Sequence, residues 1–193
     1  MNFNNLNIET NKIEKVKTLE TKIKEGVNFV FEQNPELAQI GTKEQYSEYL
    51  ETIFPDSKIK DIVYHGTQAN KFDQFNIDKL GQNSGNEGYY GKGFYFRNSY
   101  SFAGAHGKNI IAAIINLENP YEFDQKGVGE SNNILWDYRR NIIESENNGV
   151  IVYHNKNKGN YISEYSVFNS ENINILGSKK DIENFKEFMS QNK

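Results

Sequence analysis

The chain has 193 residues, a formal net charge of −4 and a pI of about 5.5, so it lacks the global basic charge of proteins that bind nucleic acids tightly without sequence preference. It contains no cysteine, which excludes disulfide bonds, thiolate catalysis and cysteine-ligated metal centres, and its three histidines lie far apart. No apolar run approaches the roughly 18 residues of a membrane span, and the N-terminus does not resemble a signal peptide, so we expect a cytoplasmic protein.

The N-terminal part of the chain is predicted to be helical. Apolar residues recur in steps of three and four from Ile13 to Val30, which is typical of one amphipathic helix over residues 11–31. Asn34–Pro35 interrupts this helix, because the residue before a proline avoids the helical conformation.

A second helix is predicted to begin at Thr42. Gln45 follows three residues later, so the two side chains can form a capping box, and Pro55 ends the segment. We therefore expect an N-terminal helical extension at residues 1–57, which packs against the remainder of the chain, residues 58–193.

Beyond residue 57 the pattern changes to short strands separated by few helices. Residues 81–93 contain five glycines and are predicted to form a loop. Its spacing matches neither a Walker A phosphate loop nor a dinucleotide-binding fingerprint, since Gly91–Lys92 is followed by glycine and leads into a strand. The order of elements is typical of an α+β fold, with strands predicted at 60–65, 94–96, 110–117, 149–154, 164–168 and 173–176, and helices at 98–106, 133–146 and 181–189.

Three strand segments alternate polar with apolar side chains, at residues 63–67, 90–96 and 163–168. Successive side chains of a strand point to opposite faces. Tyr95 is therefore expected to face away from its phenylalanine neighbours, and Glu164 away from the apolar residues that follow it. His65 ends the first predicted strand. We expect a histidine, a tyrosine and a glutamate to converge on one cleft.

Together these segments resemble the motifs of ADP-ribosyltransferases of the diphtheria-toxin and poly(ADP-ribose) polymerase type, which carry a His-Tyr-Glu triad. Within this group the sequence is most similar to small bacterial and phage-associated domains found in polyvalent proteins. The resemblance covers roughly residues 60–177 and implies split, mostly antiparallel β-sheets with flanking helices. The matching motifs are His-Gly-Thr at 65–67, Tyr-Gly-Lys-Gly-Phe-Tyr-Phe at 90–96, Ile-Ile-Asn-Leu-Glu-Asn-Pro at 114–120 and Glu-Tyr-Ser-Val-Phe-Asn at 164–169.

The resemblance implies cleavage of the nicotinamide–ribose bond of NAD and transfer of ADP-ribose, with NAD as substrate and no metal. His65 would hydrogen-bond ribose hydroxyls, Gly66 would offer its backbone to the nicotinamide amide, and Thr67 would add a hydroxyl contact. Tyr95 would stack on the nicotinamide ring. Glu164 would accept a hydrogen bond from the ribose 2′-hydroxyl and stabilise the positive charge that develops on the ribose.

Four further positions are implied to bind NAD. Gly91 and Lys92 belong to the glycine-rich loop expected over the adenosine side, where Lys92 is either a phosphate contact or a solvated side chain. The family carries a second aromatic residue eleven positions after the first tyrosine, and a serine nearby. These positions hold His106 and Ala103 here, which leaves the second stacking partner of the nicotinamide open.

The loop before Glu164 is implied to face the acceptor. Relatives that modify arginine carry Glu or Gln two residues before the catalytic glutamate, whereas this chain has Ile162, so an arginine acceptor is disfavoured. The loop is locally basic, and its partner is expected to be a macromolecule, either a protein or a nucleic acid. The candidate acceptor contacts are Lys156, Lys158, Asn160 and Tyr161.

The leading hypothesis is therefore a mono-ADP-ribosyltransferase that acts in the cytosol as a bacterial or phage toxin or effector, including one delivered into a target cell. Such a toxin would have a neutralising antitoxin as a further partner. Two alternatives stay open. A NAD glycohydrolase would use water as the acceptor and release free ADP-ribose, whereas a catalytically silent NAD-binding or partner-binding module would bind without turnover.

Overall fold

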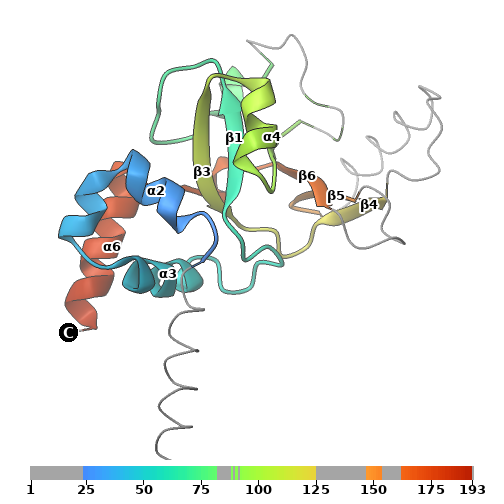
Figure 1. Ribbon diagram of the computed structural model, residues 1–193. Helices are drawn as coiled ribbons and strands as arrows, with labels where there is room; N and C mark the ends of the chain where they lie inside the picture. The colour runs from blue at the N-terminus through green and yellow to red at the C-terminus, as the bar shows by residue number, and fades with distance from the viewer. Residues whose placement is uncertain are drawn as a thin grey trace, which may run out of the picture.

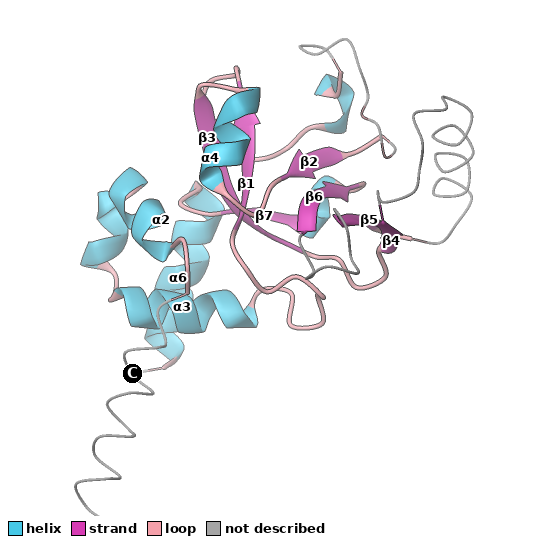
Figure 2. Ribbon diagram, turned by 45° about the vertical axis from the view of Figure 1, so that its right-hand side comes forward, coloured by secondary structure: helices cyan, strands magenta, loops and turns pink. Residues whose placement is uncertain are grey.

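The computed structural model describes residues 24–81, 88, 90, 92–124, 147–153 and 162–192 (Figure 1). Two β-sheets lie at the centre, and three helices gather at one side of them (Figures 1 and 2). The helix predicted at 133–146, the loop at 155–160 and the first part of the helix at 11–31 lie outside the described residues.

The first sheet has three antiparallel strands in the order β1-β3-β7, formed by Val63–Thr67, Asn109–Ile115 and Ile173–Ile175. β3 is the central strand and is covered on both faces, which explains its continuous apolar sequence. Ala112 and Ile114 point into a core shared with the helices, whereas Ile111 and Ile115 point into a core shared with the second sheet.

The second sheet has four strands in the order β2-β6-β5-β4, formed by Phe94–Phe96, Ile162–Val167, Gly149–Tyr153 and Tyr121–Asp124. β6 runs antiparallel to β2 and to β5, while β4 runs parallel to β5 at the edge. The sequence pattern did not predict β4, whose Tyr-Glu-Phe-Asp sequence is too short to stand out. The predicted α+β fold with split, mostly antiparallel sheets is confirmed.

The two sheets are joined in two ways. Their facing side chains form one hydrophobic core, in which buried residues of β1, β2, β3, β5, β6 and β7 meet. They are also joined through the backbone at one point, where Tyr64 and Arg97 exchange two N–H···O hydrogen bonds of 2.8 Å. This junction holds the end of β2 beside β1.

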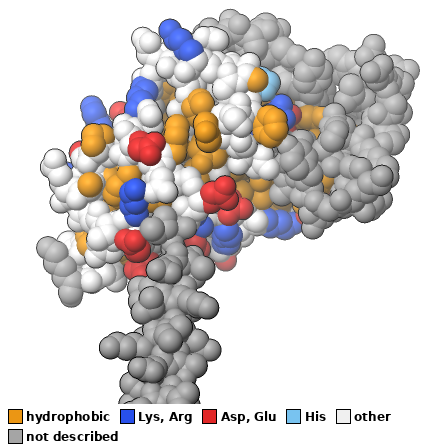
Figure 3. All heavy atoms as spheres, in the orientation of Figure 1, with side chains coloured by type: hydrophobic (Ala, Val, Ile, Leu, Met, Phe, Trp, Pro, Cys, Tyr) orange, Lys and Arg blue, Asp and Glu red, His pale blue; other side chains and the backbone are white. Residues whose placement is uncertain are grey.

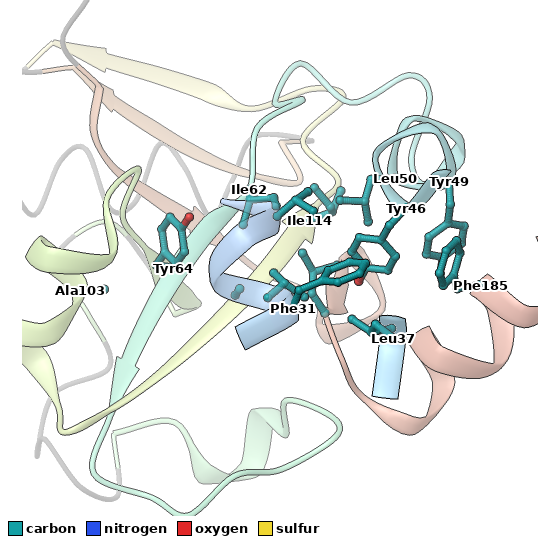
Figure 4. Close-up of a cluster of buried hydrophobic side chains, with 14 residues drawn as sticks. Phe31, Leu37, Tyr46, Tyr49, Leu50, Ile62, Tyr64, Ala103, Ile114 and Phe185 are labelled. Atoms are coloured by element: carbon teal, nitrogen blue, oxygen red, sulfur yellow. The ribbon is translucent and has the colours of Figure 1, made fainter. Parts of the chain in front are cut away.

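The helices cover the other face of the first sheet. They are α2 (Val27–Gln33), the 3₁₀ turn Pro35–Gln39, α3 (Lys43–Thr52) and α6 (Lys179–Gln191). Figure 4 shows their shared core, in which side chains from α2, α3 and α6 pack with Ile62, Tyr64 and Ile114. The helices described before residue 57 therefore share a core with the rest of the chain. The division at residue 57 stays a prediction.

Two sequence expectations about the N-terminal helices have different outcomes. The capping box of α3 is confirmed, since the side chains of Thr42 and Gln45 each accept a hydrogen bond from the other residue's backbone N–H. The single helix expected up to residue 31 is wrong, because the chain turns at Gly26 and α2 then runs to Gln33. Gly26 has a φ of +91°, and a Cβ there would overlap the Tyr64 hydroxyl, so both the backbone conformation and a tertiary contact require glycine at this break.

The helix predicted at 98–106 forms as α4 (Tyr100–Ala103) followed by the 3₁₀ turn Gly104–His106. α4 packs on β1 with Ala103 inward and exposes Tyr100 and Phe102, which are 56% and 55% exposed. Figure 3 shows the face that carries α4, on which charged side chains of both signs are interspersed with hydrophobic ones. The strand predicted at 60–65 is shifted, since β1 begins at Val63 and ends at Thr67.

Candidate active site

His65 lies in the middle of β1 and is held by the second sheet. Its Nδ1 lies 2.7 Å from the backbone oxygen of Tyr95, and because a carbonyl only accepts, Nδ1 carries the proton. The imidazole packs edge-on against Phe75, with ring centroids 5.0 Å apart. Burial lowers the pKa of His65, although the hydrogen bond to Tyr95 opposes this shift. His65 is therefore neutral at neutral pH, and its Nε2 has a lone pair that can accept a hydrogen bond.

Tyr95 lies in the middle of β2. Its neighbours Phe94 and Phe96 are buried in the core between the sheets, so Tyr95 points to the opposite face, as the alternation predicts. Its hydroxyl accepts a 2.8 Å hydrogen bond from the backbone N–H of Tyr90. Its ring lies against Gly88, where a Cβ would overlap the ring. The ring is thus fixed by the segment that precedes β2.

Glu164 lies in β6, on the same face of the sheet as Tyr95. Tyr165 and Val167 are buried in the core between the sheets, which turns Glu164 to the other face, again as predicted. Its Oε1 lies 3.2 Å from Nη2 of Arg97, and the two side chains are 17% and 26% exposed. Burial raises the pKa of Glu164, and the Arg97 charge opposes that shift.

Arg97 is a site residue that sequence reasoning missed. Arg97 directly follows the last residue of β2. Besides its contact with Glu164, its Nη2 lies 3.4 Å from Nε2 of His106. The signal that could have found it is the strand alternation, because Arg97 stands two residues after Tyr95 and so shares its face. The partner strand, which brings Glu164 opposite, cannot be read from local sequence.

Gly66 is constrained by α4. A Cβ on this residue would overlap the carbonyl oxygen of Ala103, so the close packing of α4 on β1 already requires glycine here. Ala103 has no exposed surface and belongs to the core shared with the helices. Packing of the protein on itself therefore accounts for both residues, and their predicted contacts with NAD stay predictions.

The remaining predicted positions that the structure describes are Thr67, Lys92 and His106. Thr67 ends β1, and its hydroxyl accepts a 3.1 Å hydrogen bond from the Ala69 N–H, which fixes the turn. Lys92 is exposed just before β2. His106 lies in the 3₁₀ turn after α4. Partial burial of its imidazole and the charge of Arg97 both lower its pKa. The predicted residues Gly91, Lys156, Lys158, Asn160 and Tyr161 lie outside the described residues.

Two hollows in the described surface lie away from these residues. One lies between α2, β3 and β7, and the other between α3 and α6. Within the described ranges, no three histidine, aspartate or glutamate side chains are grouped so that they could hold a metal ion. Helices long and apolar enough to cross a membrane are likewise absent from this part of the chain.

Tyr95, Arg97 and Glu164 share one face of the second sheet, whereas the His65 ring packs against Phe75 and Phe96 of the core and is joined to β2 through the backbone oxygen of Tyr95. A neutral histidine offers an acceptor nitrogen, a tyrosine offers an aromatic face, and a partly buried carboxylate is paired with a guanidinium. Such a set suits a substrate that has hydroxyl groups and a flat ring and that develops positive charge during reaction.

The match with known families begins just before β1 and ends within α6. A family described as ADP-Ribosyltransferase in polyvalent proteins matches residues 60–186, which include His65, Tyr95, Arg97 and Glu164. No curated protein matches the chain.

Proposed function

Because the chain belongs to the family of ADP-ribosyltransferases in polyvalent proteins, we propose that it binds NAD and transfers ADP-ribose to a macromolecular acceptor. The observation that carries this proposal is the placement of His65, Tyr95 and Glu164 where three strands meet. His65 and Tyr95 are joined by the 2.7 Å bond, and Tyr95 and Glu164 share one face of the second sheet.

In the proposed reaction the bond between the nicotinamide nitrogen and ribose C1′ breaks, and the electron pair leaves with nicotinamide. The ribose then carries positive charge, which the Glu164 carboxylate stabilises while it accepts a hydrogen bond from the 2′-hydroxyl. Nε2 of His65 accepts a hydrogen bond from a ribose hydroxyl, and the Tyr95 ring stacks on nicotinamide. The acceptor attacks C1′ and loses its proton.

We propose transfer of single ADP-ribose units, because the sequence before Glu164 that would serve as acceptor platform, residues 155–163, is short. Ile162 precedes the glutamate by two residues, which disfavours an arginine acceptor. A role as a cytosolic bacterial or phage toxin or effector, with an antitoxin as partner, is proposed on the resemblance alone. Residues 58–193 would form the catalytic unit.

The test is to incubate the protein with labelled NAD and cell lysate, and to measure nicotinamide release and labelled macromolecules. We expect Glu164→Gln to lower both by about 100-fold or more, as loss of a charge-stabilising group does. Glu171→Gln is the matched control, because Glu171 is exposed in a turn away from the site. Sensitivity of the label to protease or nuclease identifies the acceptor class.

Two outcomes would contradict the transfer. Free ADP-ribose as the main product, even with lysate present, would identify a NAD glycohydrolase. Calorimetric binding of NAD without nicotinamide release would identify a silent binding module.

A further inference from the structure

The Arg97 guanidinium forms an ion pair with the proposed catalytic glutamate, Glu164, at 3.2 Å. β2 and β6 pair in the antiparallel register Phe94–Val167, Tyr95–Ser166 and Phe96–Tyr165. Arg97 directly follows the last pair, and one further step of this register would bring it opposite Glu164, on the face that carries Tyr95. Opposite charges at directly opposed positions attract each other across a strand pair. The ion pair agrees with this register.

The backbone of Arg97 is held more firmly than that of an ordinary surface arginine. Its N–H and C=O both bond to Tyr64 of β1 at 2.8 Å, at the junction of the two sheets. His65, the next residue of β1, bonds to the carbonyl of Tyr95. The guanidinium therefore projects from a point that is fixed relative to both His65 and Tyr95.

The guanidinium has a second partner in His106. Nη2 of Arg97 lies 3.4 Å from Nε2 of His106, and because a guanidinium only donates, Nε2 is the acceptor. His106 is therefore neutral in this arrangement. Arg97 bridges a carboxylate in β6 and an imidazole in the turn after α4, which limits the directions in which its side chain can swing.

The proposed reaction needs Glu164 as a carboxylate, because only the ionised form stabilises positive charge on the ribose. Burial favours the neutral acid and raises the pKa of Glu164, whereas Arg97 acts in the opposite direction. Val152 stands opposite Glu164 on β5 and carries no charge. Among the described residues, Arg97, which directly follows β2, is the charged group that contacts Glu164, and His106 contacts Arg97.

We propose that Arg97 is a positioning residue, which keeps the Glu164 carboxylate ionised and aimed along the face that carries Tyr95, and which His106 in turn holds in place. The proposal rests on the proposed function for its effect on turnover. It assigns Arg97 no contact with NAD and no part in bond breaking.

The variants are Arg97→Met, which removes the charge and keeps an extended side chain, and Arg97→Lys, which restores the charge. Lys108→Met is the matched control, because Lys108 is an exposed cation in the turn before β3. The wild type and the three variants are first compared by thermal unfolding, so that a folding defect is recognised.

In nicotinamide release, we expect Arg97→Met to lower kcat by about 10- to 100-fold, the loss that a small displacement of a catalytic group causes, with KM for NAD nearly unchanged. The acid limb of its pH–kcat profile should move to higher pH. Arg97→Lys should restore most of the wild-type kcat and most of the wild-type position of the acid limb. A folded Arg97→Met protein with the wild-type kcat and pH profile would overturn the proposal. A large rise in KM with kcat unchanged would also overturn it, since it would assign Arg97 to NAD binding.

A second measurement does not depend on turnover. Carbon-13 NMR of the Glu164 carboxyl, assigned with Glu164→Gln, gives the pKa in wild type and in Arg97→Met. We expect a higher pKa in Arg97→Met, and an equal pKa would overturn the proposal. If wild type releases no nicotinamide and labels nothing, the proposed function fails, while this titration still decides whether Arg97 keeps Glu164 ionised.

Discussion

The hydroxyl of Tyr46 in α3 donates a 2.5 Å hydrogen bond to the carboxylate of Asp181 in α6, although 135 positions separate the two residues. Asp181 has no exposed surface, and it also accepts hydrogen bonds from the Tyr49 hydroxyl, the Asn174 amide and the Gly177 N–H. One buried carboxylate therefore ties α3 to α6 and to β7.

Replacing this carboxylate should destabilise the whole protein. Asp181→Ala removes the carboxylate that accepts from four donors, of which the Tyr49 hydroxyl keeps the Asp181 backbone oxygen at 3.4 Å, and we expect the free energy of unfolding to fall by about 3 kcal/mol or more. Tyr46→Phe removes one donor and should cost about 1 kcal/mol. Urea denaturation measures both, with the exposed Asp56→Ala as control, which should change stability by less than about 0.5 kcal/mol. An Asp181→Ala protein as stable as the control would show that the Asp181 carboxylate does not stabilise the contact between α3, α6 and β7.

Two glycines near the site should respond in opposite ways to alanine. A Cβ on Gly66 would overlap backbone of α4, so we expect Gly66→Ala to destabilise the protein by about 1–3 kcal/mol and to displace His65. A Cβ on Gly104 would only contact Ile110 at 3.7 Å, in helical backbone. Gly104→Ala should be neutral or stabilising by up to about 1 kcal/mol. Equal melting temperatures for the two variants would contradict the packing argument.

The Tyr95 ring should matter more than its hydroxyl. Loss of stacking on a base-like ring costs about 1–3 kcal/mol, so Tyr95→Ala should lower kcat/KM for NAD by roughly 5- to 150-fold. Tyr95→Phe keeps the ring and removes the hydroxyl that accepts from the Tyr90 N–H, so its activity should stay near wild type. The exposed Tyr100→Ala is the control. Steady-state nicotinamide release measures kcat/KM for each variant. Full activity in Tyr95→Ala would show that Tyr95 does not take part in NAD binding or turnover.

The contribution of His65 to the stability of the protein should fall as the pH drops below the ordinary pKa of histidine, about 6.5. The folded-state pKa of His65 is lowered, mainly by burial, so the unfolded chain takes up its proton first. The stability that His65 contributes is complete above about pH 6.5, and it is lost as the pH falls towards the folded-state value.

Urea denaturation at several pH values, compared between wild type and His65→Gln, isolates this contribution. The pKa values of Glu164 and Asp181 are raised by burial, which gives an opposite slope, but both groups are present in each protein. We expect a shallower loss of stability below about pH 6.5 in His65→Gln. Parallel curves would show that His65 titrates alike in the folded and unfolded chains.

Local patterns were sufficient wherever one strand or one turn determines the outcome. The faces of Tyr95 and Glu164 follow from alternation with buried neighbours, and the capping box of α3 follows from Thr42 and Gln45. These features depend on residues within a few positions of one another.

Features that depend on distant contacts were missed. The break occurs at Gly26, which packs closely against Tyr64, and the contact of Arg97 with Glu164 joins residues that are 67 positions apart in the sequence. Asp181 follows the helix cap Ser178 by three residues, where a solvated acidic residue is ordinary. The tyrosines that surround its carboxylate lie more than 130 positions away, so its burial cannot be read from the local sequence.

His65 is carried by one sheet, whereas Tyr95 and Glu164 are carried by the other. The site is therefore a property of the docking of two sheets and belongs to neither sheet alone. A small shear between them would separate His65 from the Tyr95 carbonyl while every strand kept its own hydrogen bonds. Loss of activity should thus precede loss of secondary structure when denaturant is added.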